Sequence, residues 1–286
     1  LSPSGRACAR LWPTGRACAA AATAARVAVL VHTCDAYAPF WPGWSRNFAA
    51  EWNASLCWPV YFAPEMLDPA AHVPLVGCGR ARPLRTGGGE FSTRLLTALR
   101  ALPTPHVLYL QEDSWLTGES EASSGALLCA LALLDAGHFD GVRLERSEQL
   151  ASGLYHLEET EHRCPGGAGG EQLVYRFAAH NRWLYSHQPG VWRRSFLLEG
   201  ADGDAASALM QPGENPWLNE LLASRRVEAR HARVALLPLD WYVSVSSGGE
   251  LNEVGRVMES MAAADASPLP VDLEVALRPP GDQREL

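Results

Sequence analysis

Two groups of polar residues follow short apolar runs and carry side chains that could do chemistry. His32-Thr-Cys-Asp35 comes directly after the apolar residues 27–31, and Gln111-Glu-Asp113 comes directly after residues 107–110. Continuous apolar runs of this length predict strands that are buried on both faces. Because parallel α/β sheets bind ligands at the carboxyl ends of their strands, both groups are candidate binding residues.

The adjacent acids Glu112 and Asp113 place two carboxylates at the end of a predicted strand. Like charges held close together raise each other's pKa unless a cation lies between them. A divalent cation would serve, and oxygen ligands favour Mg²⁺ or Mn²⁺. The alternative is that the two acids cap a following helix, where negative charge is also favourable.

A third candidate is Glu214, which lies between Pro212-Gly213 and Asn215-Pro216. This setting predicts the start of a helix, where the helix dipole favours the ionised carboxylate. An ionised carboxylate beside a reacting hydroxyl can accept its proton, so Glu214 is a candidate general base. The alternative is an acid that only begins the helix.

The elements that would position these residues alternate along the chain from Arg26. We predict strands over 27–31, 60–62, 107–110, 141–144, 173–177 and 183–185, and helices over 40–52, 91–102, 125–136, 191–199 and 214–223. This alternation predicts an α/β fold with a doubly wound, mostly parallel sheet flanked by helices. The segment 156–164 is rich in His, Glu and Cys but fits no zinc spacing, and we expect a solvated loop there.

Composition narrows the possible functions. The chain has 286 residues, 47% of them hydrophobic, and a net charge of −8. It contains no lysine, which excludes Schiff-base chemistry and a lysine-bearing phosphate loop. The acidic balance argues against nucleic acid or an anionic membrane as partner. No apolar run reaches the roughly 18 residues that a transmembrane helix needs.

Three regions are expected from these changes in composition. Residues 1–25 contain a short duplication and no acid, and are interpreted as a low-complexity leader or linker, with an organellar transit peptide as one possibility. Residues 26–265 form the predicted α/β domain, and residues 266–286 form an extended tail. A cytoplasmic and an organellar location both stay open.

Three segments together resemble a known family. Val107-Leu-Tyr-Leu-Gln-Glu-Asp113 resembles the metal-binding acidic motif of GT-A-fold glycosyltransferases, with Gln111 where Asp is commoner. Tyr185-Ser-His-Gln-Pro-Gly-Val-Trp192, continuing to Leu198, is similar to a segment of small bacterial-type sugar transferases. So is Gly213-Glu-Asn-Pro-Trp217, with Glu220 three residues later. The resemblance covers about residues 26–255 and implies a GT-A-like fold.

The resemblance also implies an activity: transfer of a sugar from a nucleotide-sugar donor to the hydroxyl of a glycan, lipid or small molecule. Thr33, Cys34 and Asp35 would contact base and ribose. Tyr37 would offer a ring face, unless it is an ordinary packing residue. Arg94 would be a partner for the diphosphate, unless it is a surface arginine.

On the same basis, Asp113 would bind Mn²⁺ or Mg²⁺ on the diphosphate, with Glu112 alongside. Glu214 would be the base of an inverting displacement, and Glu220 is the rival acid. Trp192 and Trp217 could stack on sugar faces or belong to the core.

Two other functions stay open. A nucleotidyltransferase shares this type of sheet and a carboxylate-held metal, although the segment 32–35 lacks a basic glycine-rich loop. A degenerate fold of this type could instead bind carbohydrate or a protein partner without catalysis, which Gln111 in the acidic motif keeps possible.

Overall fold

The apolar run after Arg26 forms strand β1 (Val27–His32), and all six of its residues are buried. β1 belongs to a computed structural model that describes residues 26–53, 56–71, 81–118, 120–151, 153, 155–166, 170–181, 183–199, 208–247, 250–253 and 255–256. The predicted leader at 1–25 and the predicted tail at 266–286 lie outside the described residues.

β1 is the third strand from one edge of the main sheet. The nine strands of this sheet in the described chain have the order β3-β2-β1-β4-β9-β6-β10-β8-β7. The other bounds are β2 (Val60–Ala63), β3 (Arg82–Pro83), β4 (His106–Gln111), β6 (Gly141–Glu145), β7 (Leu157–Pro165), β8 (Glu171–Phe177), β9 (Gly190–Arg193) and β10 (Val234–Pro238). β1 is parallel to β2 and β4, β2 to β3, and β6 to β10. β9 is antiparallel to both β4 and β6, and β8 and β7 add an antiparallel edge.

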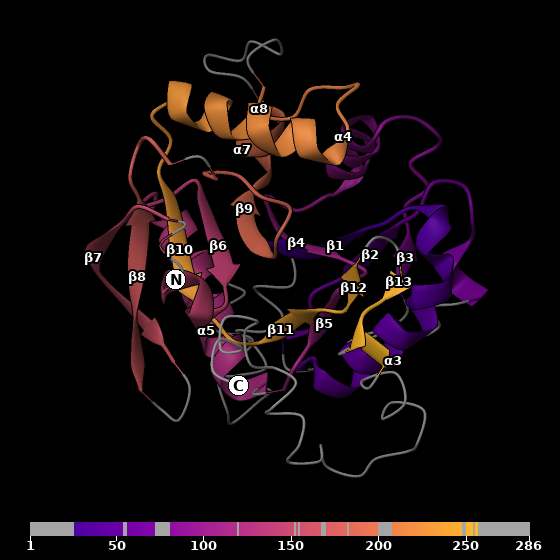
Figure 1. The fold of residues 1–286 in the computed structure, drawn as a ribbon, viewed down its shortest axis with the longest axis horizontal. Coiled ribbons are helices and arrows are strands. Elements are labelled where there is room, and N and C mark those ends of the chain that lie inside the picture. Colours follow the sequence, from indigo (N-terminus) through magenta and orange to yellow (C-terminus); the bar gives the residue numbers. More distant parts are fainter. Residues whose placement is uncertain are drawn as a thin grey trace, which may run out of the picture.

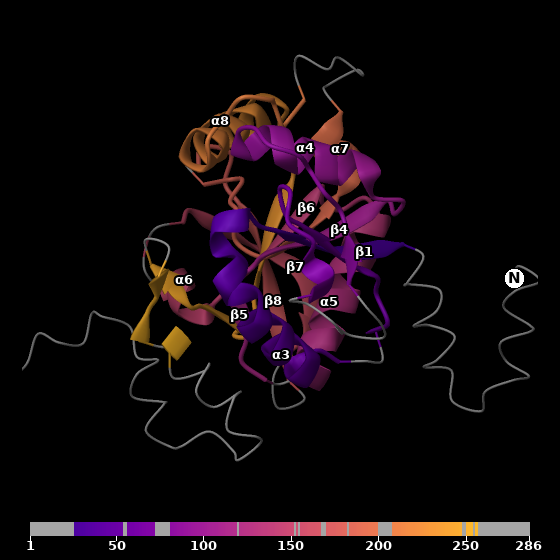
Figure 2. The ribbon, with the colours of Figure 1, turned by 90° about the vertical axis from the view of Figure 1, so that its right-hand side faces the viewer.

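Helices cover both faces of this sheet (Figures 1 and 2). One face carries α3 (Trp41–Glu51) and α5 (Ser120–Asp135), and the other carries α4 (Phe91–Ala101), α7 (Arg194–Leu198) and α8 (Pro216–Ala229). Successive side chains of a strand point to opposite faces, so Val29 joins the core under α3 and α5 while Leu30 joins the core under α4 and α8. The predicted α/β fold with a mixed, mostly parallel sheet is confirmed.

Shorter elements complete the described chain. They are η1 (Asp35–Phe40), η3 (Pro69–Ala71), α6 (Ser147–Ala151), β5 (Ser114–Leu116), β11 (Tyr242–Ser244), β12 (Ser246–Ser247) and β13 (Glu250–Leu251). β11 pairs with β5 next to the acidic motif, and β12 pairs with β13. Within the described ranges, no helix combines the length and the apolarity needed to cross a membrane.

The structure differs from the prediction at residues 191–193, where a strand replaces the start of the expected helix. β9 fills the gap between β4 and β6, and Trp192 lies opposite Gly141 of β6. A Cβ atom at Gly141 would lie 2.1 Å from the Trp192 ring, so the glycine makes room for this buried side chain. The strand predicted at 183–185 is a turn, in which the Trp183 N–H donates to the Asn181 side chain at 3.1 Å.

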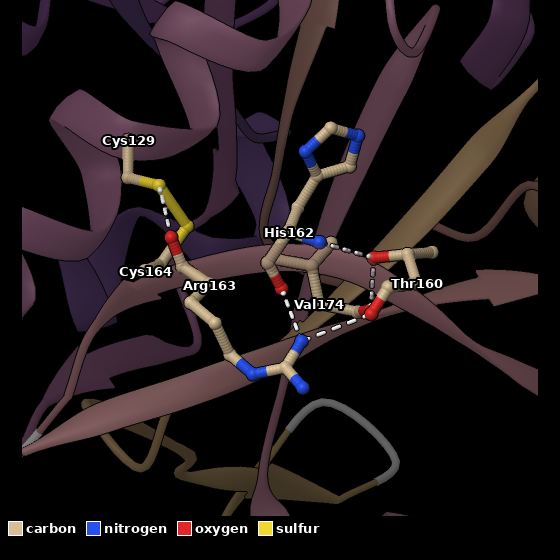
Figure 3. The surroundings of a disulfide bond; sticks show 6 residues. All are labelled: Cys129, Thr160, His162, Arg163, Cys164 and Val174. Atoms are coloured by element: carbon tan, nitrogen blue, oxygen red, sulfur yellow. Dashed lines mark hydrogen bonds between the residues drawn. A yellow bond between two sulfur atoms is a disulfide. The ribbon is translucent and has the colours of Figure 1, made fainter.

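The solvated loop expected at 156–164 is also wrong, because these residues mostly form the edge strand β7. β7 pairs with β8, and its Cys164 is bonded through a disulfide to Cys129 of α5 (Figure 3). The Cys129 sulfur also lies 3.6 Å from the carbonyl oxygen of Arg163. The disulfide therefore fastens the outermost strand of the sheet to the helix that covers it.

We expect this disulfide to contribute strongly to stability, because it closes a loop between positions 35 residues apart. Chain-entropy estimates for such a loop give about 4 kcal/mol. Replacing Cys129 and Cys164 together by alanine should lower the free energy of unfolding in urea by about that amount. Each single alanine variant already breaks the cross-link, so the double variant should lose little more than either single one. Additive losses from the two single variants would contradict this.

Candidate active site

The polar ends of β1 and β4 meet, as their sequence positions predicted. The parallel register pairs His32 with Gln111, so the loops that follow begin side by side. They open into a cleft of about 610 Å³. The cleft is lined by the end of β1 and η1, the start of α4, the end of β4, residues 187–188, and the start of α8: His32, Thr33, Cys34, Tyr37, Gly89, Glu90, Phe91, Arg94, Gln111, Glu112, Asp113, His187, Gln188, Pro216, Trp217 and Glu220.

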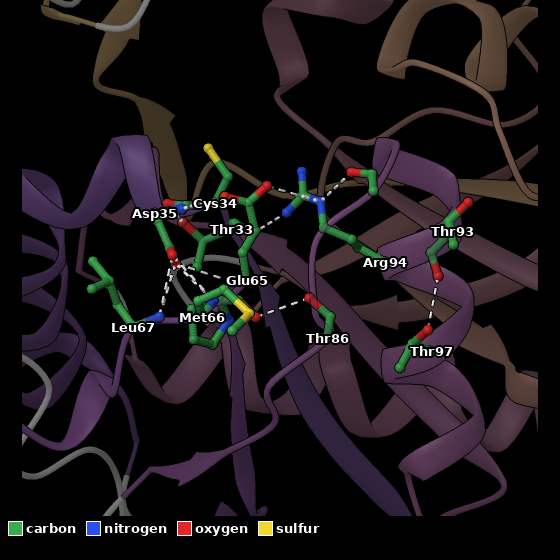
Figure 4. Close-up of polar contacts among 12 residues, drawn as sticks. Thr33, Cys34, Asp35, Glu65, Met66, Leu67, Thr86, Thr93, Arg94 and Thr97 are labelled. Atoms are coloured by element: carbon green, nitrogen blue, oxygen red, sulfur yellow. Dashed lines mark hydrogen bonds and ion pairs between the residues drawn. The ribbon is translucent and has the colours of Figure 1, made fainter.

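Of the predicted nucleotide-binding residues after β1, Thr33, Cys34 and Tyr37 line the cleft, and Asp35 does not. The Asp35 carboxylate accepts backbone N–H groups of Glu65, Met66 and Leu67 at 3.1–3.3 Å (Figure 4). This carboxylate thus fixes the loop after β2 against the loop after β1.

Arg94 lines the cleft from the first turn of α4 and is buried. Its Nη1 donates to the carbonyl oxygen of Thr33 at 2.8 Å, and its Nε donates to the carbonyl oxygen of Gly89 at 3.2 Å. The Nε atom also lies 3.3 Å from a carboxylate oxygen of Glu65 (Figure 4). Arg94 is therefore not a surface arginine: its guanidinium is held at the cleft, and Nη2 is the nitrogen that these contacts leave available.

The two acids after β4 have different surroundings, although both line the cleft. Glu112 is buried, and its Oε2 has no hydrogen-bond partner within the described residues. Burial, followed by the negative charge of Asp113, raises the pKa of Glu112 to about 8. Asp113 is half-buried, and its Oδ2 accepts a hydrogen bond from the Ser244 hydroxyl at 2.9 Å. At neutral pH the Glu112 carboxyl is therefore mostly protonated.

The structure does not bring Glu214, the expected base, to the cleft. Its buried carboxylate is ion-paired with Arg226 and accepts a hydrogen bond from the Asn219 amide at 2.7 Å. Its backbone N–H donates to the Ser92 hydroxyl at 2.8 Å, and its carbonyl accepts the Ser92 N–H at 3.0 Å. Glu214 therefore anchors the start of α8 to the start of α4.

Glu220, one turn into α8, does line the cleft. Its Oε1 accepts two hydrogen bonds, from the Ser186 hydroxyl at 3.0 Å and from the His187 backbone N–H at 2.7 Å. These bonds fix the carboxylate and leave Oε2 without a partner in the described structure. Oε2 is the oxygen on this side of the cleft that is free to accept a proton.

Two buried histidines also line the cleft: His32, a member of the polar group after β1, and His187, to which the sequence pattern gave no role of its own. His32 and His187 are buried, and both rings meet Phe91 edge to face, with centroids 4.6 and 4.4 Å from it. Burial lowers the pKa of His187 to about 4 and that of His32 well below its usual range. Both rings are neutral at pH 7. Their positions in the sequence, His32 at a strand end and His187 directly before Gln188, do not reveal that the two rings are buried.

Comparison with known proteins defines the fold. No protein-family model matches the chain, and no curated protein does. The structure of S. aureus TarS 1–349 with UDP-GlcNAc is similar, with a TM-score of 0.50 and 16% identity over 79% of this chain and 60% of that one. Mannosyltransferase PcManGT from Pyrobaculum calidifontis, in complex with GDP-Man and Mn²⁺, has a TM-score of 0.50 and 14% identity over 86% of this chain and 66% of that one. The fold is of the GT-A type. The chain spans less than two thirds of the length of either of these GT-A structures.

Within this GT-A fold, the acidic pair Glu112 and Asp113 offers oxygen atoms that could hold a divalent cation. The described residues contain no group of three or more His, Cys, Asp or Glu side chains that could hold a metal by themselves. Oε2 of Glu112, the residue next to Asp113 in the chain, is nonetheless a buried oxygen without a hydrogen-bond partner in the described structure. Mg²⁺ is commonly bound by one or two carboxylates plus substrate phosphates and water, and this pair meets that requirement.

We expect the neutral His187 to make the fold sensitive to acid. Below pH 6.5 the unfolded chain protonates this residue, while the folded chain does not until about pH 4. The free energy of unfolding therefore falls as pH falls through this window, by up to about 3 kcal/mol. The nearby Glu220 carboxylate opposes the shift, but burial is the larger cause.

The check is urea unfolding at pH 7 and pH 4 of the wild type and His187→Gln. Glutamine does not titrate, so the variant should lose less stability on acidification, by about the same 3 kcal/mol. An equal loss in both proteins would show that His187 is not a buried neutral group.

Proposed function

We propose that the protein transfers a sugar from a nucleotide-sugar donor to an acceptor hydroxyl by direct displacement. One observation carries this proposal: a single cleft is lined by Asp113 at a strand end, by the fixed guanidinium of Arg94, and by the oriented carboxylate of Glu220. The cleft thus combines groups that could bind a diphosphate, Arg94 and a cation on Asp113, with a carboxylate that could accept a proton, Glu220. The GT-A fold supports this proposal, since both similar structures contain nucleotide sugars.

In the proposed reaction, the acceptor oxygen forms a bond to the anomeric carbon of the donor. The bond from that carbon to the diphosphate oxygen breaks, and its electron pair leaves with the nucleoside diphosphate. The proton of the acceptor hydroxyl passes to Oε2 of Glu220, which acts as general base. Direct displacement inverts the anomeric configuration. We assign the base to Glu220 rather than Glu214, because Arg226 and Asn219 occupy the Glu214 carboxylate.

On the donor side, Nη2 of Arg94 would bind a diphosphate oxygen, and Thr33, Cys34 and Tyr37 would contact the nucleoside. A Mn²⁺ or Mg²⁺ ion held by Asp113, with Glu112 alongside, would neutralise charge on the leaving diphosphate. Mn²⁺ in the mannosyltransferase complex supports this choice of cation. Asp35 would act indirectly by bracing the loop that carries Thr33 and Cys34.

The experiment is calorimetric titration with a panel of UDP-, GDP- and CMP-sugars, with and without Mn²⁺. Assays of donor hydrolysis, of transfer, and of reaction between nucleoside triphosphates and sugar phosphates follow. We expect one nucleotide class to bind, more tightly with Mn²⁺, and the bound donor to be consumed. Binding without consumption would favour a binding module. Consumption of a nucleoside triphosphate and a sugar phosphate would favour a nucleotidyltransferase. Either result would refute the proposal.

A further inference from the structure

Trp217 differs from the other tryptophans of the described chain. Its side chain is 78% exposed, whereas Trp183 is half-buried and seven others are buried: Trp41, Trp44, Trp52, Trp58, Trp115, Trp192 and Trp241. It also lines the cleft, one helical turn before Glu220. Ligand clefts are commonly lined by aromatic side chains beside a few placed polar groups, and Trp217 beside Glu220 fits this pattern.

The backbone that carries Trp217 is fixed. Asn215 caps α8 by accepting the Leu218 N–H at 2.9 Å, and Pro216 occupies the first helical turn. Just before this cap, Glu214 is tied to Ser92 of α4 and to Arg226 of α8. The exposed ring is thus presented on a rigid helix start, so little backbone entropy is lost when a ligand meets it.

The geometry points to a carbohydrate acceptor that stacks on the Trp217 ring with its attacking hydroxyl toward Glu220. This inference deepens the proposed function and rests on it. Trp217 and Glu220 are three positions apart on α8, so their side chains lie on the same side of the helix. An acceptor held against the ring is therefore presented to the carboxylate that receives its proton.

The surroundings of the ring favour a sugar over a lipid or an apolar peptide. A pyranose has an apolar face of C–H groups and a rim of hydroxyls, which suits one aromatic face bordered by carboxylates. Glu112 apart, the cleft is lined by three acids, Glu90, Asp113 and Glu220, against one arginine, and so disfavours a polyanionic acceptor. Of the other exposed large apolar side chains in the described chain, Leu218 is adjacent but does not line the cleft, and Met66, Leu67 and Leu128 lie on other elements.

The test uses the donor found by calorimetry and three acceptor types: methyl glycosides of glucose, galactose and mannose; 1-octanol; and a serine-containing peptide. Trp217→Phe keeps a ring face, Trp217→Leu keeps apolar area without a ring, and Leu218→Ala is the matched control outside the cleft. We expect a methyl glycoside to be the acceptor. Its KM should rise about tenfold or more in Trp217→Leu, less in Trp217→Phe, and not in Leu218→Ala. Donor hydrolysis without acceptor should be unchanged in Leu218→Ala, which lies outside the cleft.

Two results would overturn the inference while the proposed function stands: equal glycoside KM values in Trp217→Leu and wild type, or transfer to 1-octanol or the peptide and to none of the glycosides. Equal activity of the Leu and Phe variants would show that apolar area, and not a ring face, is what matters, and would also overturn it. If no nucleotide sugar is bound or hydrolysed, the proposed function fails and the inference fails with it.

Discussion

Replacing Glu220 by glutamine should lower kcat for sugar transfer by about 10²-fold or more and leave donor affinity nearly unchanged. Losing a positioned general base typically has an effect of 10²–10⁴-fold. Glutamine keeps the shape of the side chain, and its carbonyl oxygen can still accept the hydrogen bonds from Ser186 and from the His187 backbone N–H. The change therefore removes basicity without removing the contacts that position the group. Steady-state kinetics and calorimetry with the same donor measure both effects.

Glu214→Gln is the matched control, because it makes the same chemical change six positions earlier. It should lower stability rather than kcat, since Arg226 would lose its buried partner, at a cost of about 2 kcal/mol. Arg226 remains about one-fifth exposed, which keeps the cost below that of a fully buried pair. A loss of kcat in folded Glu214→Gln, with normal kcat in Glu220→Gln, would return the base to Glu214. Retention of the donor's anomeric configuration would contradict direct displacement altogether.

The central sheet and the place of the cleft could be predicted because the signals for them are local. The uninterrupted apolar runs before His32 and Gln111 can only be buried on both faces, and parallel strands of this kind have their carboxyl ends at one edge. The polar residues after both strands therefore had to come together. The observed pairing of His32 with Gln111 places Thr33, Cys34, Glu112 and Asp113 around one cleft.

The choice between Glu214 and Glu220 could not be made from the sequence, because it depends on tertiary contacts. Glu214 is taken out of the cleft by Arg226, three helical turns later, and by Ser92 of another helix. Glu220 is oriented by Ser186 and His187, more than 30 residues earlier. The sequence gives the spacing of the two acids, but it does not show which of them forms an ion pair with an arginine.

Among the strands that were not predicted, which include the buried β10, the strands β9 and β7 show two different physical reasons. β9 is only four residues long and is followed directly by the helical residues of α7, so Val191 and Trp192 fit a helical pattern as well as a strand. These residues form a strand because they pair with both β4 and β6 in the folded sheet, which the local sequence does not show. β7 is an edge strand in which eight of nine residues are at least partly exposed, so it shows no apolar alternation. β7 is held in the sheet by its pairing with β8 and by the disulfide to Cys129 rather than by burial of apolar side chains.

Asp113→Asn should abolish the increase in nucleotide-sugar affinity that Mn²⁺ produces, and should lower turnover by about 10²-fold or more. A metal ion on a leaving diphosphate contributes several kcal/mol, and each 1.4 kcal/mol is a factor of ten in rate. Asparagine can still accept the hydrogen bond from Ser244, so the fold around the acidic motif should persist. Calorimetry with and without Mn²⁺, together with thermal melting of the apo protein, separates lost metal binding from unfolding.

Glu90→Gln is the control for this prediction, because it removes one negative charge from the same cleft at the start of α4 instead of at the strand end. If Asp113 is a ligand, the affinity gained from Mn²⁺ disappears in Asp113→Asn and survives in Glu90→Gln. If the cleft attracts the cation only through its overall negative charge, both variants weaken equally, since each loses one unit of charge. Unchanged Mn²⁺ dependence in Asp113→Asn would show that Asp113 is not a ligand of the cation and would contradict the metal site assigned to it.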